Sequence, residues 1–287
     1  MDLSILIATV PPRKKYLNRL LFKLQNQIIE NNLGDKIEVV IYEDDFESSL
    51  GEKKNKLYHS AKGKYVVSID DDDDVSDDYC KLICDVISTH DVDQICIGHR
   101  YFHDNVDKWE PIVISKEYKY YSMVFLKFFN LYITKYHDIG YDWGLFFKKT
   151  PLLRTKKQGL KYFLIILFLK IFQNKLTKGL RHTCHTTPIK KEIVQSVNFT
   201  NRPREQDIEW ATEIYKKGLI KTEYIIDKDL YFYYYDHQMS INRGKWGKLE
   251  VNEKRKKITE VTSSIKDIDW EIKPIEKISL RWLWKIF

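Results

Sequence analysis

Apolar runs alternate with helix-period patterns along the first hundred residues of the chain. Four short runs have the length of buried strands, at residues 3–8, 37–42, 65–69 and 94–98. Three helices are predicted between them: one on the leucines at 17, 20, 21 and 24, one over 53–61, and one from about residue 77. Alternating strands and helices indicate a mostly parallel sheet covered on both faces. The pattern therefore predicts an α/β fold, in which ligands bind at the carboxyl ends of the strands.

The second half of the chain has weaker periodicity. Two stretches rich in aromatic residues and lysine, 118–135 and 157–178, are predicted to be helical or irregular. Four shorter elements are clearer: a helix from Pro188, a helix from about Asp207 to Lys217 that ends at Gly218, a strand over 230–237 and an amphipathic helix over 278–287. The predicted regions are 1–110, 111–250 and a C-terminal extension, 251–287.

Composition and charge add two constraints. The chain has 287 residues, of which 43% are hydrophobic and 14% aromatic, so it can bury a sizeable core and is not disordered. Its net charge of +7 is unequally divided, because residues 1–110 carry a net −8 and the remainder a net +15. Residues 143–191 hold twelve Lys and Arg and no acidic residue, which is typical of a solvated basic face or of a surface for an anionic partner.

No segment is predicted to cross a membrane. The longest apolar block, Tyr162–Leu169, is far shorter than the roughly 20 residues that a span needs. The first residues have the pattern of a core strand and lack a basic signal region. The four cysteines form no CxxC pair, so buried free thiols in a reducing compartment are expected. We expect a cytoplasmic protein, either soluble or peripheral at an anionic membrane.

Five consecutive aspartates, Asp70–Asp74, follow directly on the predicted strand at 65–69. Carboxylates this close repel one another and raise one another's pKa unless a cation neutralises them. A hard divalent ion suits the position, since Mg²⁺ commonly takes one or two protein carboxylates together with substrate phosphates. A solvated acidic loop is the alternative, but the place at a strand end favours a metal site.

The two preceding strand ends carry further polar groups. Glu43 and Asp44 follow the second strand and can accept hydrogen bonds from a base or a ribose. Arg13 follows the first strand and can reach a phosphate. Neither GxGxxG nor GxxxxGK[ST] occurs in the sequence, which argues against a Rossmann dehydrogenase and a P-loop enzyme.

Three segments together resemble a known family: LSILIAT from residue 3, IYEDD from residue 41 and GEKKNKLYHSAKGKYVVSIDDDDDVSDDY from residue 51. They are similar to the nucleotide-sugar half of family-two glycosyltransferases. The resemblance implies a GT-A-like α/β fold, with a mostly parallel sheet sandwiched by helices and a mixed acceptor-side half. It implies that residues 1–110 bind the nucleotide sugar, and that residues 111–250 bind the acceptor and hold the catalytic base.

The resemblance implies roles for single residues on the donor side. In the family, an Asp-x-Asp element after a strand holds a divalent metal on the donor diphosphate. This implies Asp72 as a ligand of Mn²⁺ or Mg²⁺, with Asp70 and Asp71 beside the donor and Asp73 next to them. The remaining residues implied at the donor nucleotide are Thr9, Arg13, Glu43, Asp44, Lys54 and Asn55.

The acceptor side matches in two shorter segments. Residues 185–192 are similar to an acceptor-side segment of the family and place His185 there. The run REQDIEW, residues 204–210, resembles a Glu-Asp-x-x-aromatic motif, which implies Asp207 as the catalytic base. Gln206 stands where the family usually has Glu, so Glu205 and Glu209 stay open as the working carboxylate.

The last candidates are Trp210 and three residues after the predicted strand at 230–237. Trp210 belongs to the same motif and is placed on the acceptor side, with the core as the alternative. Many GT-A enzymes take a metal or phosphate contact from a C-terminal histidine, which implies His237 as a second metal ligand. Ser240 and Arg243 are placed at the diphosphate by the same comparison.

These residues predict an inverting, metal-dependent hexosyltransferase. Charge on the leaving nucleoside diphosphate is neutralised by the metal, and Asp207 accepts the proton of the acceptor hydroxyl. A UDP-sugar is the expected donor and a glycan the expected acceptor. Glycosylation of hydroxymethylated DNA is the alternative, in which the basic stretch at 143–191 would follow phosphates. A nucleotidyltransferase and a catalytically silent nucleotide- or metal-binding module also stay open.

Overall fold

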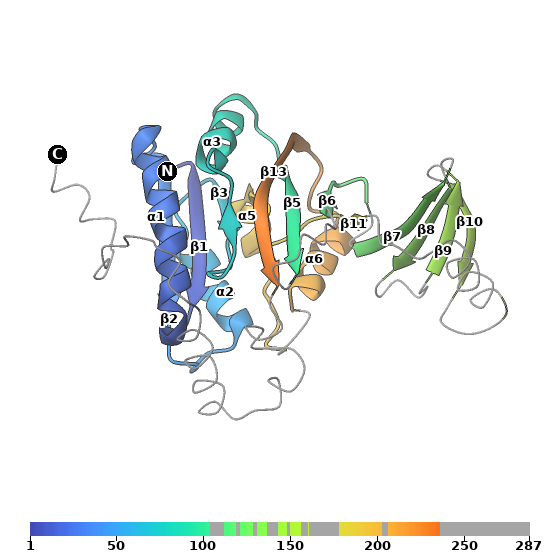
Figure 1. Ribbon diagram of the computed structural model, residues 1–287, viewed down its shortest axis with the longest axis horizontal. Coiled ribbons are helices and arrows are strands. Elements are labelled where there is room, and N and C mark those ends of the chain that lie inside the picture. The colour runs from blue at the N-terminus through green and yellow to red at the C-terminus, as the bar shows by residue number, and fades with distance from the viewer. Residues whose placement is uncertain are drawn as a thin grey trace.

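A mixed sheet with helices against both faces of its larger part forms the body of the protein (Figure 1). The computed structural model describes residues 1–103, 112–118, 121–128, 131–136, 143–147, 150–155, 160, 178–202 and 206–235. Between residues 121 and 155 this description consists of the backbone path and the strand pairing.

The larger part of the sheet is mostly parallel, as predicted. Its strands are β1 (Leu3–Thr9), β2 (Ile37–Glu43), β3 (Tyr65–Ser68), β4 (Asp74–Val75), β5 (Gln94–His103), β12 (Ile189–Lys190) and β13 (Glu223–Tyr235). β1 pairs in parallel with β2 and β3, and β13 runs parallel to β5. β12 lies antiparallel between β3 and β5, and β4 pairs antiparallel with β13. A mixed half thus follows a parallel one, in agreement with the expected fold class.

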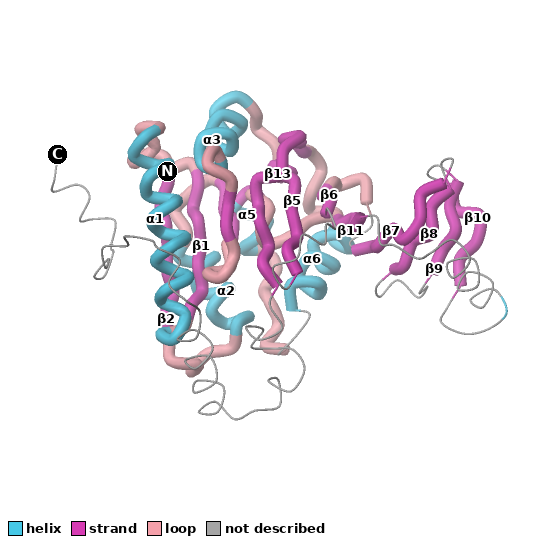
Figure 2. The backbone as a smooth tube through the Cα atoms, in the orientation of Figure 1, coloured by secondary structure: helices cyan, strands magenta, loops and turns pink. Residues whose placement is uncertain are grey.

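Helices cover the two faces of this sheet in two groups (Figure 2). They are α1 (Lys14–Glu30), α2 (Leu50–Ser60), α3 (Tyr79–Thr89), α5 (Lys191–Gln195) and α6 (Gln206–Lys217), and the 3-10 turn η1 (Pro11–Arg13) precedes α1. One hydrophobic core joins α1 and α3 to the sheet, and a second core joins α2, α5 and α6 to the opposite face. The helices predicted in the first hundred residues are confirmed.

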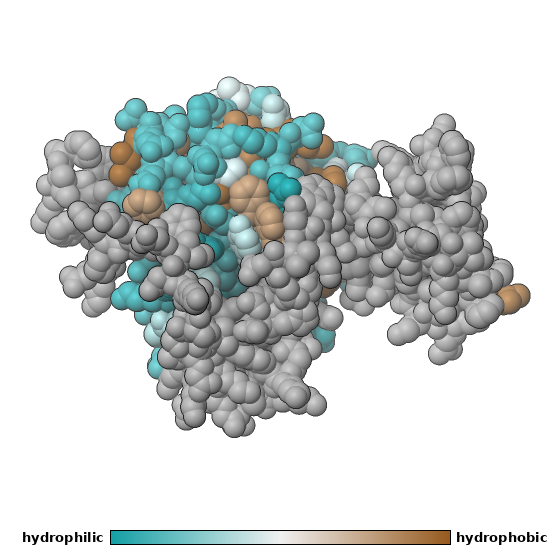
Figure 3. All heavy atoms as spheres, in the orientation of Figure 1, coloured by the Kyte–Doolittle hydropathy of each residue, from teal (hydrophilic) through white to brown (hydrophobic). Residues whose placement is uncertain are grey.

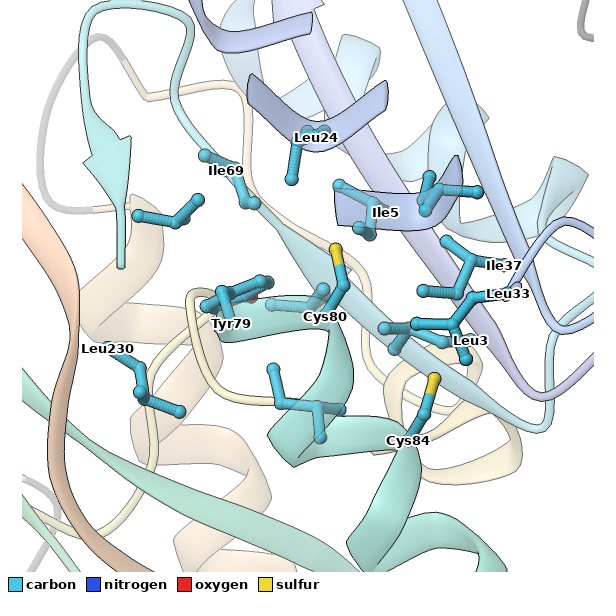
Figure 4. Packing of buried hydrophobic residues seen from close by; sticks show 14 of the residues in the cluster. Leu3, Ile5, Leu24, Leu33, Ile37, Ile69, Tyr79, Cys80, Cys84 and Leu230 are labelled. Atoms are coloured by element: carbon cyan, nitrogen blue, oxygen red, sulfur yellow. The ribbon is translucent and has the colours of Figure 1, made fainter. Parts of the chain in front are cut away.

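Alternate residues of the strands are divided between these two cores. Leu3 and Ile5 of β1 face the α1/α3 core, whereas Leu6 faces the second core, formed with α2, α5 and α6. Figure 4 shows Cys80 and Cys84 of α3 within the α1/α3 core. Successive side chains of a strand point to opposite faces, so a strand buried on both faces must be apolar throughout. Each fully buried aliphatic side chain contributes about 1.5–3 kcal/mol to stability. All four cysteines are buried free thiols, as expected.

Local capping sets the limits of two helices. Ser49 Oγ accepts a hydrogen bond from the Glu52 backbone N–H (3.2 Å), and the Glu52 carboxylate accepts one from the Ser49 backbone N–H (2.8 Å). This capping box starts α2 three residues before the predicted position. α6 ends at Gly218, whose φ of 59° lies in the left-handed region that glycine adopts without strain, as the sequence predicted.

The sheet continues beyond β5 as a mostly antiparallel extension, in which β6 and β11 pair in parallel (Figure 1). Its strands are β6 (Ile112–Ile114), β11 (Lys178–Arg181), β7 (Tyr121–Phe128), β8 (Leu131–Tyr136), β9 (Trp143–Phe147) and β10 (Thr150–Thr155). The prediction of helical or irregular structure over 118–135 is therefore wrong. Aromatic and β-branched residues favour strands. β7 pairs antiparallel with β8 from Phe128 and Leu131 onward, and β9 with β10 from Phe147 and Thr150 onward.

The helix predicted from Pro188 begins three residues later. Ile189 and Lys190 instead form β12, and Ile189 is 0% exposed. Backbone hydrogen bonds join this strand to the β5 side, from Ile95 N–H to the Pro188 carbonyl and from Lys190 N–H to the Asp93 carbonyl (both 2.9 Å). On the β3 side, the Lys191 N–H donates to the Lys64 carbonyl (2.9 Å). The gain from completing the sheet outweighs the local preference of proline for the first position of a helix.

The helices and the surface of the described residues have limited apolar length and area. Among these residues, no helix is long and apolar enough to cross a bilayer. Most of the described surface in Figure 3 is hydrophilic, with scattered hydrophobic residues. The predicted strand over 230–237 is confirmed as far as Tyr235. The predicted helix over 278–287 lies outside the described residues, and so does the stretch 157–178, predicted to be helical or irregular, apart from residues 160 and 178. The predicted division near residue 110 stays a prediction.

Candidate active site

The candidate site lies where the parallel strands β1, β2 and β3 end. Thr9, Glu43 and Ser68 are the last residues of these strands, and the acidic run Asp70–Asp74 follows β3. Pairing of β1 with both neighbours brings the three ends to one edge of the sheet. This is the edge at which an α/β fold is expected to bind its ligand.

Two of the five aspartates are buried within the framework. Asp71 and Asp73 are 2% and 1% exposed. Asp71 accepts a hydrogen bond from Thr9 Oγ1 (2.6 Å), and Asp73 accepts hydrogen bonds from the Tyr231 hydroxyl and from the Tyr234 backbone N–H. Burial raises the pKa of Asp71 to about 7, and burial also raises the pKa of Asp73 well above its usual range. These two carboxyl groups fix the shape of the loop.

The other three aspartates reach solvent. The side chains of Asp70, Asp72 and Asp74 are 31%, 27% and 20% exposed. Cations of the chain pair with each of them: Lys54 (3.5 Å) and His185 (3.6 Å) with Asp70, Arg13 with Asp72, and Lys23 (3.5 Å) with Asp74. Burial alone would raise the pKa of Asp70, but Lys54 and His185 lower it. The predicted repulsion within the run is therefore offset in part by the chain's own cations.

α1 holds the backbone of the acidic run. The Arg19 guanidinium Nη2 donates to the carbonyls of Asp72 (3.0 Å) and Asp73 (2.8 Å), and Gln27 Nε2 donates to the Ser76 carbonyl (2.9 Å). Sequence reasoning missed these contacts, because they join positions about fifty residues apart. The only signal was Gln27, a polar residue at a position of α1 that belongs to its buried face.

A buried lysine ties the ends of β1 and β2 together. The Lys53 ammonium donates to the Thr9 carbonyl (3.0 Å) and pairs with Asp44, whose carboxylate also accepts the Ser48 backbone N–H (2.9 Å). Burial opposes the charge on Asp44, but Lys53 lowers its pKa below the usual value. Glu43 is exposed at the same edge. Lys53 is thus a site residue that sequence reasoning did not single out.

Asn55 does not face the predicted nucleotide site. Its side-chain oxygen accepts the Phe199 backbone N–H (2.8 Å), and its Nδ2 donates to the Phe199 carbonyl (2.9 Å). Both polar ends of this amide are used to join α2 to the segment before α6. The predicted nucleotide-binding role of Asn55 is replaced by a structural one. The neighbouring Lys54 points to the site and pairs with Asp70.

A buried loop between β11 and β12 contacts the acidic run. His185 lies 3.6 Å from Asp70 through Nε2 and 3.8 Å from the Cys184 thiol through Nδ1. Arg181 Nη1 contacts the same sulfur at 3.2 Å. Burial and Lys54 oppose protonation of His185, but Cys184 and Asp70 raise its pKa above the usual range. These two contacts favour the protonated form of His185 beside the carboxylate of Asp70.

Asp207 lies in the first turn of α6 and close to the same cations. Burial alone would raise the pKa of Asp207, but His185, Arg181 and Lys54 lower it. Within the described residues, no cation lies within ion-pair distance of this carboxylate. An ionised carboxylate without a paired cation can accept a proton, but its lowered pKa makes it a weaker base than a free carboxylate.

The neighbours of Asp207 on α6 have other roles. Glu209 accepts a hydrogen bond from Thr200 Oγ1 and pairs with Arg202. Trp210 is 1% exposed, donates its indole N–H to the Val197 carbonyl (3.0 Å) and stacks on Phe199 with 4.9 Å between ring centroids. The placement of Trp210 at the acceptor is thus corrected, because its ring belongs to the core behind α6. Four candidates, Glu205, His237, Ser240 and Arg243, lie outside the described residues.

The exposed carboxylates fit a divalent cation that is shared with a substrate. Within the described residues, no three His, Cys, Asp or Glu side chains form a complete metal site. Asp70 and Asp72 nevertheless present partly exposed hard oxygen ligands on either side of the buried Asp71. Mg²⁺ and similar ions are often held in this way, by one or two carboxylates, substrate phosphates and water.

The chain is similar to solved structures of TarS from S. aureus and of HddC from Yersinia pseudotuberculosis. TarS 1-349 in complex with UDP-GlcNAc matches at 14% identity and a TM-score of 0.47, over 92% of this chain and 66% of that one. Another TarS 1-349 structure matches at 14% identity and 0.45, over 82% and 60%. HddC matches at 11% identity and 0.36, over 79% and 91%.

These similarities are low, and they assign no function. The chain spans 60% of the length of the TarS 1-349 structure that it matches at a TM-score of 0.45. No protein-family model and no characterised protein sequence matches the chain.

Proposed function

We propose that the protein is a metal-dependent, inverting glycosyltransferase that uses a nucleotide-sugar donor. The observation that carries the proposal is the placement of two kinds of carboxylate around one cationic group. Asp70 and Asp72 are exposed at the end of β3, and Asp207 lies at the start of α6. His185 and Lys54 contact Asp70 and also lower the pKa of Asp207, so the two sides face one site.

On the donor side, the chain provides oxygen ligands and cations for a diphosphate. Asp72, with Asp70 beside it, would hold Mg²⁺ or Mn²⁺, which would supply Lewis-acid stabilisation of the negative charge on the leaving group. Arg13 and Lys54 lie against these carboxylates and add positive charge for phosphate oxygens. Asp44, held by Lys53 next to the end of β2, would accept a hydrogen bond from the base.

On the acceptor side, Asp207 accepts the proton of the attacking hydroxyl. The hydroxyl oxygen forms a bond to the anomeric carbon while the bond from that carbon to the diphosphate oxygen breaks. One displacement with one base and no enzymic nucleophile inverts the configuration at this carbon. UDP-linked hexoses are the proposed donors, and a glycan is the proposed acceptor.

The deciding experiment follows both products of donor turnover. Purified protein is incubated with Mn²⁺ and a panel of UDP-sugars, with glycan acceptors in one arm and hydroxymethylated DNA in the other. Release of UDP together with a glycosylated acceptor supports the proposal, and the arm that reacts identifies the acceptor class. Release of pyrophosphate would identify a nucleotidyltransferase, and donor binding without turnover in both arms would identify a silent binding module.

A further inference from the structure

The pairing of Arg13 with the acidic run has a consequence for how the site is loaded. We propose that Arg13 is a built-in counterion of Asp72, which a divalent cation displaces and which then contacts the donor diphosphate. The inference rests on the proposed function, since it concerns regulation of the same site. It makes Arg13 a competitor of the metal in the empty site and a donor ligand in the loaded one.

Within the described residues, the Asp72 side chain differs from those of Asp70, Asp71 and Asp73 in having no partner besides Arg13. Asp71 is also held by Thr9, Asp73 by Tyr231 and the Tyr234 backbone, and Asp70 by Lys54 and His185. In the part of the chain that the structure describes, Arg13 is the only cation paired with Asp72. Among Asp70–Asp73, Asp72 is therefore the carboxylate that a movement of one side chain would release.

The contact between Arg13 and the acidic run is electrostatic and lacks the geometry of a fork. One nitrogen, Nη2, serves both Asp71 (2.9 Å) and Asp72, whereas strong arginine–carboxylate pairs use two parallel N–H groups. Nη2 and Nε are buried and have no well-aligned hydrogen-bond acceptor among the described residues. The N–H groups at these two nitrogens could therefore donate hydrogen bonds to phosphate oxygens.

Arg13 is also placed to remain in the site after it leaves Asp72. It lies in η1, directly after β1, and Asp71 is a second anchor that is buried and fixed by Thr9. The guanidinium would keep its contact with Asp71 and give up its contact with Asp72. It then lies beside the cation that replaced it, where the diphosphate of a donor has its charge.

The test measures Mn²⁺ binding without donor, by calorimetry or by electron paramagnetic resonance of free Mn²⁺, in wild type, Arg13→Gln and Arg13→Lys. We expect Arg13→Gln to bind Mn²⁺ roughly tenfold more tightly, because a competing unit charge near Asp72 is gone. The same variant should bind UDP in saturating Mn²⁺ roughly tenfold more weakly, because a phosphate ligand is gone. Arg13→Lys keeps the charge and should bind Mn²⁺ as wild type does.

A matched control separates local competition from general electrostatics. Lys23→Gln removes one positive charge from the same acidic run, at Asp74, and should change Mn²⁺ affinity by no more than about twofold. Unchanged or weaker Mn²⁺ binding in Arg13→Gln, or equal gains in Arg13→Gln and Lys23→Gln, would overturn the inference. If wild type binds Mn²⁺ with UDP and Asp72→Ala does not, the proposed metal site stands independently. Absence of Mn²⁺ binding to every protein, with UDP present, would remove both.

Discussion

The carboxylates that follow β3 and the carboxylate at the start of α6 differ in how the chain's cations surround them. Asp70, Asp72 and Asp74, which follow β3, each form an ion pair with a cation of the chain. At the start of α6, burial opposes the charge on Asp207, but His185, Arg181 and Lys54 lower its pKa. This carboxylate has no ion pair among the described residues. A carboxylate that is paired with a cation of the chain can exchange this cation for a bound ion. A carboxylate that accepts a proton needs an oxygen that is not held in an ion pair. This difference is what we expect if Asp207 accepts the proton and the acidic run binds the ion, as proposed.

Removing the open carboxylate should have the largest effect on turnover. Asp207→Asn keeps the size of the side chain but cannot accept a proton, so sugar transfer should fall by about 10²–10⁴-fold. UDP affinity, measured by calorimetry, should stay near wild type. Glu209→Gln is the control on the same helix, because Glu209 is engaged by Thr200 and Arg202. A loss in Glu209→Gln with normal activity in Asp207→Asn would reverse the assignment.

Removing a paired carboxylate should affect binding in place of proton transfer. Asp72→Ala should weaken Mn²⁺-dependent UDP binding by roughly a hundredfold, because the ligand that holds the ion on the diphosphate is lost. The fold should persist, since the Asp72 side chain is 27% exposed. Asp77→Ala removes another carboxylate near the same loop, one whose side chain is 95% exposed, and serves as the control. Equal losses in both variants would show that only the total charge matters.

The buried Asp71 should make metal-free stability depend on pH. Its pKa of about 7 in the folded protein exceeds the unfolded value of about 4, so between these values the folded state binds the extra proton. The free energy of unfolding therefore decreases as pH rises from about 4 to about 7, with a slope of up to about 1.4 kcal/mol per pH unit from this group. Thermal melts in chelator should show this decline, and Asp71→Asn should reduce it. Identical pH profiles would contradict the assignment.

The smallest effect is expected where a side chain only joins the two sides. Asn55→Ala removes both hydrogen bonds to the Phe199 backbone and should lower the free energy of unfolding by about 1–3 kcal/mol. Because Asn55 does not face the site, Mn²⁺ and UDP affinities at a temperature well below the melt should change little. A large loss of UDP affinity in this folded variant would restore Asn55 to the nucleotide site.

The first hundred residues could be predicted well because their signals are local. The strand ends, α1 and the acidic run follow from periodicity and from the rule that ligands bind at strand ends. The different burial of Asp71 and Asp72 could not be predicted, because it depends on Thr9 and Arg13, about sixty residues away. The strands at 121–155 were missed for a related reason. Strand pairing joins separate segments, and a window of apolar and aromatic residues fits more than one structure.

The position of β12 governs when the sheet can be completed. β3 and β5 are close along the chain, yet the place between them is filled by Ile189 and Lys190, and β13 adds to β5 from residue 223 onward. During synthesis, the amino-terminal strands must therefore wait for about a hundred further residues before their open edges are paired. Such late, non-local closure slows folding and leaves strand edges exposed to other chains. A fragment that ends near residue 110 would keep those edges permanently, so we expect it to aggregate where the longer chain folds.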